Sequence, residues 1–238
     1  INEEIVNQIK AEASWTPMEV DENPFAYWSE DEIKSMLGTK LLTPEQIEND
    51  DNVIFEDGSD LEDYPLNFDS REEWPEFIHP IRNQGHCGSC WAFGAAEAFS
   101  DRYTIASNGD FQEIFSPQDL VDCSAQNYGC NGGFVNKAWD YIHIVGAITD
   151  DCKHYTSGDD GKTHKCVKAC DDSDTEYVRY KAGNKQHATT TKGGRGMIMR
   201  NGPVEGAFTV YEDFMSYSSG VYQHKTGKKL GGHAIKIL

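Results

Sequence analysis

The stretch Gln84–Gly94, QGHCGSCWAFG, places two cysteines three residues apart, directly before a run of small and aromatic residues. That run predicts a buried helix whose first turn holds Cys90. The unpaired N–H groups at a helix N-terminus lower the pKa of a thiol there, so Cys90 is a candidate nucleophile, with Ser89 as the expected N-cap. The side chain of Gln84 supplies an amide donor nearby, as an oxyanion site requires.

The cysteine pair has two other interpretations. A thioredoxin-type C-x-x-C redox pair is one, although that motif has its aromatic residue before the first cysteine and here it follows the second. A zinc site is the other, but the ligand-like residues lack a C-x-x-C knuckle and a second half-site; they are His164, Cys166 and Cys170. The chain has seven cysteines. In an oxidising compartment, this odd count predicts three bridges and one thiol with another role.

The negative charge of the chain is concentrated at its start. Residues 1–65 contain 18 Asp and Glu against 3 Lys and Arg, and the whole chain of 238 residues has a formal net charge of −19. An acidic chain has no basic surface to neutralise phosphates, so we expect no nucleic-acid partner. No apolar run of about 18 residues occurs, so we expect no membrane partner. The change in charge predicts a separate N-terminal segment that ends near Pro65.

Apolar periodicity and capping residues predict helices up to about Cys170 and mainly strands and turns after it, an α+β arrangement. The expected helices are 3–13, 30–37, a short turn from 44, 90–107, one that begins at 117, and 134–145; the expected strands are 204–211, 220–224 and 232–238. Residues 49–63 are acidic and poor in periodic apolar residues. This composition predicts an exposed, protease-accessible linker.

The stretch around Cys90 resembles the nucleophile segment of papain-like cysteine proteases, whose signature C-G-[SA]-C-[WY] precedes a histidine by about 130 to 150 residues. In this chain His233 lies 143 residues after Cys90. Other stretches resemble the cathepsin B group of that family: CNGG at 130–133, NGPVEGAF at 201–208, and NFDSREEWP at 67–75. The earlier segment, with WT at 15–16 and LGT at 37–39, resembles the short propeptide of the same group.

This resemblance implies a papain-like two-lobed α+β fold. Residues 1–65 would be an inhibitory propeptide and 66–238 the peptidase domain, with a helical lobe over roughly 66–170 and a β-barrel-like lobe over 171–238. The family's asparagine, which orients the imidazole, would follow Leu238. We therefore expect the chain to be C-terminally truncated and its β lobe to be incomplete.

The resemblance also implies cysteine endopeptidase chemistry. Cys90 would be a thiolate paired with the imidazolium of His233, while the Gln84 amide and the Cys90 N–H would hold the oxyanion. The implied substrate-binding residues are Asn131, Gly132, Gly133, Phe134, Val135, Ala207 and Ala234. The implied disulfides are Cys87–Cys130, Cys123–Cys166 and Cys152–Cys170, which would leave Cys90 free.

A member of this family would act as a monomer on peptide and protein substrates, without a cofactor or metal, and its own propeptide would inhibit it. It would work in a lysosomal or endosomal vacuole or be secreted. We expect acidification to protonate carboxylates of the propeptide, weaken its docking and permit cleavage near residues 63–66. The rival hypothesis is a non-catalytic fragment or pseudo-enzyme that acts as a binding protein.

The chain differs from cathepsin B in the loop after Cys152. Only 13 residues separate Cys152 from Cys166, no His-His pair occurs, and His154 and His164 are isolated. The loop that gives cathepsin B its dipeptide-trimming activity is therefore missing, so we expect an open primed side of the cleft and endopeptidase action. The resemblance places Phe134, Val135, Ala207 and Ala234 in the S2 pocket, which we therefore expect to be apolar. His86 replaces a small residue near the thiol. It either alters the pH dependence of the thiol or is a tolerated surface change.

Overall fold

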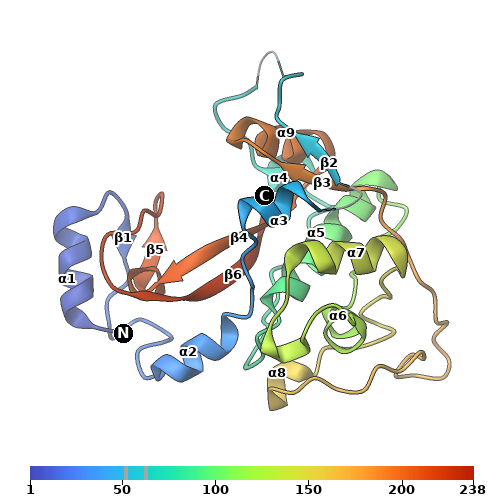
Figure 1. Cartoon of the computed structure of the whole chain (residues 1–238), viewed down its shortest axis with the longest axis horizontal. Helices are drawn as coiled ribbons and strands as arrows, with labels where there is room; N and C mark the ends of the chain where they lie inside the picture. The colour runs from blue at the N-terminus through green and yellow to red at the C-terminus, as the bar shows by residue number, and fades with distance from the viewer. Residues whose placement is uncertain (51–52, 62–63) are drawn as a thin grey trace.

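The structure, a computed structural model, describes residues 1–50, 53–61 and 64–238. Its central element is helix α5 (Cys90–Ala106), which packs against α6 (Pro117–Cys123) and α7 (Val135–Ile144) on one side (Figure 1). Strands β4 (Val204–Tyr211) and β6 (Lys229–Ile237) pack against its other side. A helix covered from both sides needs apolar residues around most of its circumference, which the sequence of α5 provides.

The core of the helical lobe lies between α5, α6 and α7. Phe99 stacks on Phe115 with ring centroids 4.3 Å apart, and Trp91 and Ile142 are fully buried beside them. Three short elements complete this lobe: α4 (Ser70–Glu73), η1 (Gly129–Asn131) and α8 (Ser157–Asp160). The predicted helices over 90–107 and 134–145 are confirmed, because their apolar spacing was clear. The helix that begins at 117 is also confirmed, and Ser116 caps it as predicted.

The strands of the described residues form three two-stranded sheets and no closed barrel. In the largest sheet β4 runs antiparallel to β6, which places Phe208 opposite His233. The predicted strand over 220–224 is wrong, because the strand in this region, β5 (Tyr217–Ser219), ends before residue 220. It follows the short helix η2 (Glu212–Ser216). The carboxylate of Asp213 accepts hydrogen bonds from residues 222, 225 and 226, and these bonds hold the segment in a turn.

One helix lies in the part of the chain where strands and turns were predicted. Helix α9 (Thr191–Asn201) begins at Thr190, whose hydroxyl accepts a hydrogen bond from the Gly193 N–H, and it buries Met197. Three glycines within α9 give the segment a low intrinsic helix propensity. Tertiary packing of its few apolar side chains therefore decides its conformation.

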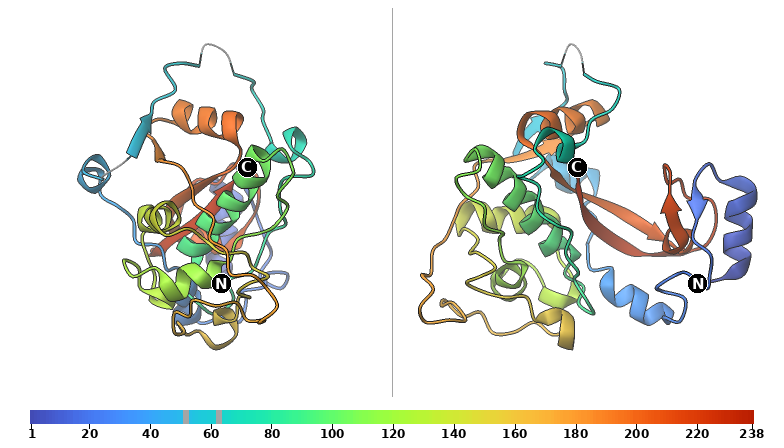
Figure 2. Two further views of the ribbon diagram at one scale, coloured as in Figure 1. Left: turned by 90° about the vertical axis from the view of Figure 1, so that its right-hand side faces the viewer. Right: turned by 180° about the vertical axis from the view of Figure 1, so that it is seen from behind.

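The N-terminal segment (residues 1–65) crosses the molecule instead of forming a separate unit. It is drawn in blue in Figure 1 and contains α1 (Glu3–Glu12), α2 (Glu30–Met36) and α3 (Pro44–Glu48), which confirms the three helices predicted there. The further views show the same course from α1 past the β4–β6 sheet (Figure 2). Strand β1 (Thr16–Pro17) pairs antiparallel with β5, and the indole of Trp15 donates to the carbonyl of Gln223 at 2.9 Å.

The predicted exposure of residues 49–63 is confirmed for most of the described residues of this stretch, but the stretch is not an irregular linker throughout. Strand β2 (Val53–Glu56) pairs in parallel with β3 (Lys185–Ala188), and the side chain of Asp50 is only 10% exposed. The four residues of β2 are too few to show a periodicity. Residues 51–52 and 62–63 lie outside the described residues. Among the residues that the structure describes, no helix is long and apolar enough to cross a membrane.

Candidate active site

Cys90 is the first residue of α5 and is 1% exposed. Its thiol is the free one, and the residue stands at the N-terminus of a long helix, where the helix dipole favours a thiolate. The expectation that Ser89 caps this helix is wrong, because its side chain makes no capping hydrogen bond. Its hydroxyl instead lies 2.7 Å from the phenol oxygen of Tyr155.

Cys87 and Cys90 have separate environments. Cys87 is bonded to Cys130, and Gly88 N–H donates to the Cys130 carbonyl at 3.0 Å, so this disulfide supports the backbone that leads to the thiol. The structure also joins Cys123 to Cys166 and Cys152 to Cys170. These bonds overturn both alternatives, the redox pair and the zinc site, because the sulfurs that either would need are already used.

The amide of Gln84 lies at the same end of α5 and is half-buried. Its Nε2 donates to the carbonyl of Cys87 at 2.7 Å and to the carbonyl of Met36 at 2.8 Å. The first bond fixes the side chain on its own loop. The second engages it with the N-terminal segment, and this contact was not foreseen from the sequence.

His233 is in the middle of β6, across the cleft from Cys90. Its Nδ1 is buried and has no hydrogen-bond partner among the described residues. Burial lowers the pKa of the imidazole to about 4, because a charged ring would lose its hydration there. Within the described part of the chain, no hydrogen bond or ion pair links His233 to Cys90, and the sulfur instead contacts Thr39.

The N-terminal segment passes directly over the thiol. The hydroxyl of Thr39 lies 3.0 Å from the sulfur of Cys90, and Thr39 is 5% exposed. Residues 38 and 39 are hydrogen-bonded to both walls of the cleft. Gly133 N–H donates to Gly38 O at 2.9 Å, and Thr39 N–H donates to Gly232 O at 3.1 Å. Lys40 N–H donates to Gly133 O at 2.8 Å.

The backbones at this crossing approach closely because glycines line it. A Cβ atom on Gly38 would lie 1.8 Å from the Gly88 carbonyl oxygen, and one on Gly132 would lie 2.3 Å from the Gly38 oxygen. On the opposite wall, a Cβ on Gly232 would lie 2.1 Å from the Thr39 oxygen. The glycines of this region therefore create a groove that accepts an extended backbone.

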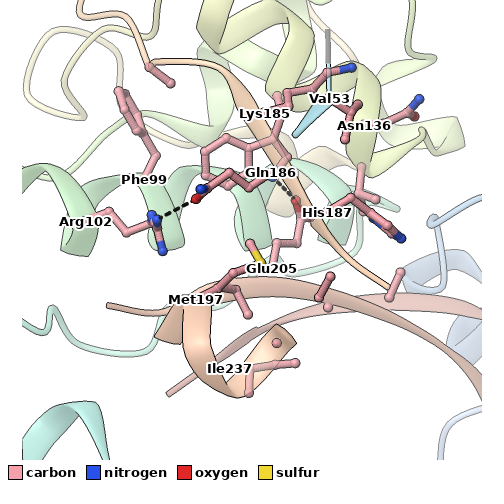
Figure 3. Close-up of a pocket in the computed structure, with 18 of the residues that line it drawn as sticks. Val53, Phe99, Arg102, Asn136, Lys185, Gln186, His187, Met197, Glu205 and Ile237 are labelled. Atoms are coloured by element: carbon pink, nitrogen blue, oxygen red, sulfur yellow. Dashed lines mark hydrogen bonds between the residues drawn. The ribbon is translucent and has the colours of Figure 1, made fainter. Parts of the chain in front are cut away.

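Beside the crossing a cavity of about 1010 Å³ lies between the two lobes (Figure 3). The sequence placed Val135 and Ala207 in a substrate pocket, and both line this cavity. The lining is not purely apolar, because Figure 3 shows Arg102 and Glu205 among it. Asn131 and Phe134 do not line the cavity, and Ala234 is buried opposite Ala207 in the sheet.

Glu205 is the most perturbed acid of the cleft. Its Oε2 accepts a hydrogen bond from the indole of Trp139 at 2.8 Å, and its Oε1 is buried without a partner among the described residues. Burial raises the pKa of this carboxyl well above its usual value, since the charged form would be poorly solvated. The residue lies in the stretch that resembles the cathepsin B group, but its alternating pattern did not indicate a buried acid.

A second contact of the N-terminal segment lies at the edge of the cavity. The ammonium of Lys185, 7% exposed, is 3.0 Å from the carboxylate of Asp50 and 2.5 Å from that of Asp140 on α7. Burial acts to raise the pKa of Asp140, but hydrogen bonds from Lys185 and Lys137 hold it below its usual value. Residues 135 positions apart in sequence thus meet in one buried ion-pair cluster, which no sequence pattern could show.

Comparisons with known proteins agree with this geometry. A family model described as papain family cysteine protease matches residues 64–238. The chain is 37% identical to cathepsin B-like cysteine proteinase 5 of Caenorhabditis elegans, over 86% of this chain and 68% of that protein. It is 43% identical to a gut-specific cysteine proteinase of the same organism, over 75% of this chain and 60% of that protein.

Solved structures give the same result. Procathepsin B S9 from Trypanosoma congolense superimposes with a TM-score of 0.84 and 27% identity, over 99% of this chain and 82% of that one. A digestive procathepsin L2 from Tenebrio molitor gives a TM-score of 0.73 and 26% identity, over 96% of this chain and 70% of that one. Both neighbours are proenzymes, and the match extends over the N-terminal segment as well as the two lobes.

Proposed function

Because the chain belongs to the papain family of cysteine proteases, we propose that it is a cathepsin B-like endopeptidase that is made as an inactive proenzyme. Residues 1–65 are the propeptide and residues 66–238 carry the peptidase domain. The Cys90 thiolate attacks the peptide carbonyl, and His233 gives its proton to the leaving amine. The Gln84 amide and the Cys90 N–H bind the oxyanion, and water then hydrolyses the thioester.

The observation that carries this proposal is the crossing of the propeptide over the thiol. An attacked carbonyl must meet the nucleophile and the oxyanion donors together, each at about 3 Å. In the structure the nucleophile and the Gln84 donor contact different residues of the propeptide. Thr39 Oγ1 lies 3.0 Å from the Cys90 sulfur, whereas Met36 O lies 2.8 Å from Gln84 Nε2. The propeptide therefore blocks both the thiol and the Gln84 amide, but no single carbonyl of its described residues contacts both. This is the arrangement expected of an inhibitor that is not cleaved.

Acidification releases the propeptide through His233, whose pKa is lowered to about 4 by burial. Thr39 N–H is bonded to the carbonyl of Gly232, directly before His233, so we infer that undocking uncovers the imidazole and lets its pKa return towards 6.5. The open form then binds more protons between about pH 6.5 and pH 4. Docking therefore weakens as the pH falls through that range. The ion-pair cluster on Lys185 does not take part in this release, because hydrogen bonds from Lys185 and Lys137 hold the pKa of Asp140 below its usual value.

The primed side of the cleft is open in this proposal. His154 Nδ1 lies 3.6 Å from the carboxylate of Asp171, and His164 Nε2 lies 3.1 Å from that of Asp160. His164 thus pairs with an acid of its own loop, and His154 lies near an acid that directly follows Cys170. This arrangement supports endopeptidase action without a histidine clamp for a substrate C-terminus. The three disulfides favour an oxidising compartment, and the acid-dependent release favours an acidic one.

The test is labelling of the full-length proenzyme by a peptidyl epoxide, with mass spectrometry to locate the adduct. We expect negligible labelling at pH 7, and labelling of Cys90 together with loss of the N-terminal segment at pH 4.5. A Cys90→Ser variant, whose propeptide contacts other than the thiol are retained, is the control and should stay unlabelled. Processed enzyme that neither labels nor cleaves a peptide substrate would support the rival binding protein. Equal labelling at both pH values would contradict the acid-dependent release.

A further inference from the structure

Tyr155 contacts both sides of the loop that leads to the thiol. Its hydroxyl donates to the backbone carbonyl of Gln84 at 2.8 Å and lies 2.7 Å from the hydroxyl oxygen of Ser89. A phenol has one proton to donate. Since that proton goes to the Gln84 carbonyl, the Ser89 hydroxyl must be the donor in the second bond. Each of the two hydrogen bonds therefore has one defined direction.

The ring of Tyr155 is itself fixed. It is half-buried and meets the ring of Phe93 on α5 edge to face, at 4.6 Å and 88°. Burial raises the pKa of its phenol to about 12. The hydroxyl therefore keeps its proton at every pH at which a protease of this family would work. The donor to Gln84 is thus present in both neutral and acidic conditions.

The backbone that follows Tyr155 supports the same loop. Gly158 O accepts a hydrogen bond from His86 N–H at 2.9 Å, and a Cβ on Gly85 would lie 2.6 Å from that oxygen. The segment 155–158 therefore lies directly beneath residues 84–86. The short loop between Cys152 and Cys166, which lacks the histidine pair, contacts the proposed oxyanion site from behind.

We propose that Tyr155 is a positioning residue that holds the Gln84 amide and the Cys90 N–H at the spacing required by one oxyanion. Gln84 carries one of these donors, and Ser89 directly precedes the residue that carries the other. A single hydroxyl bonded to both residues fixes the distance between the two ends of a glycine-containing loop. This inference rests on the proposed function, because it assumes that Gln84 stabilises the oxyanion.

The test compares Tyr155→Phe with wild type in the mature enzyme, released from the full-length proenzyme. The variant keeps the ring that packs on Phe93 and removes only the hydroxyl. Misplaced oxyanion donors act on the transition state, so we expect kcat for a peptide substrate to fall about 10- to 100-fold with KM within twofold. Alkylation of Cys90 by iodoacetamide forms no oxyanion, and its rate should stay within twofold of wild type.

Two further variants make the result specific. Tyr141→Phe is the matched control: its hydroxyl is also buried, and it bonds Asp119 at 3.1 Å in the helical lobe, away from the loop. It should leave kcat within twofold. Ser89→Ala removes one of the two bonds with little change in packing, and we expect a smaller fall in kcat than for Tyr155→Phe. It provides the test if the Tyr155 variant does not fold.

A double-mutant cycle separates this inference from the proposed function. If Tyr155 acts through Gln84, then Tyr155→Phe should lower kcat by less than about threefold in a Gln84→Ala background. Additive losses, or a parallel loss of alkylation rate, would overturn the positioning role. So would an unchanged kcat in Tyr155→Phe when Gln84→Ala lowers it. If Gln84→Ala itself leaves kcat unchanged, the oxyanion role in the proposed function fails instead.

Discussion

If residues 1–65 are the propeptide, as proposed, a single methyl group added at Gly38 should open the cleft of the proenzyme. In the structure a Cβ at this position would lie 1.8 Å from the Gly88 carbonyl oxygen and 2.4 Å from its carbonyl carbon. Both atoms belong to backbone that the Cys87–Cys130 disulfide holds in place. Normal contact therefore requires the propeptide to move away by about 1.5 Å.

The cost follows from the hydrogen bonds that this movement breaks. Three backbone bonds between 2.8 and 3.1 Å hold residues 38–40 on Gly133 and Gly232. Each contributes about 0.5–1.5 kcal/mol, so Gly38→Ala should weaken docking by about 2–4 kcal/mol in total. This corresponds to a ~30- to 1000-fold increase in the open fraction. The contact between Thr39 and the thiol is lost in the same movement.

The assay is the rate at which a peptidyl epoxide labels Cys90 in the intact proenzyme at pH 7. When opening is fast relative to labelling, the rate is proportional to the open fraction and should rise by the same factor. Gly183→Ala is the matched control, because it adds the same methyl group where no atom lies within 4 Å. A labelling rate for Gly38→Ala within twofold of wild type would refute the account of how the propeptide is held.

Three further changes have expected outcomes. Asp50→Asn removes one of the two carboxylates on Lys185 and should weaken docking by about 2 kcal/mol, so that epoxide labelling at pH 7 rises ~30-fold; an unchanged rate would exclude this contact as a determinant of docking. Glu205 has a raised pKa, so the folded protein favours its protonated form and loses stability as the pH rises above about 4.5. Glu205→Gln should therefore unfold at higher urea than wild type at pH 7 but not at pH 4, and parallel profiles would contradict this. Replacing Cys152 and Cys170 by serine opens a bridge between residues 18 positions apart and should lower the free energy of unfolding by about 3 kcal/mol, measured by urea denaturation with Cys90 blocked.

Local sequence was sufficient where one stretch carries the whole signal. The apolar run after Cys90 predicted α5, and the capping residues Ser29 and Thr43 predicted the short helices α2 and α3, whose capping boxes the structure shows. Such signals need only neighbours within four residues. The strand predicted over 220–224 and the missed helix α9 show the limit, because Asp213 and the packing of Met197 decide those segments from outside them.

The sequence by itself determined the family, and it predicted the residues proposed to carry its chemistry, because a nucleophile motif and its distant histidine are matters of residue type and spacing. Only the tertiary structure decided what these residues contact in this state. Thr39 lies on Cys90, Met36 on Gln84, Asp50 on Lys185, and Tyr155 behind the loop. Each contact joins segments far apart in the chain. Such contacts depend on how the lobes and the N-terminal segment pack together. This packing produces no periodic pattern of residues from which the contacts could be predicted.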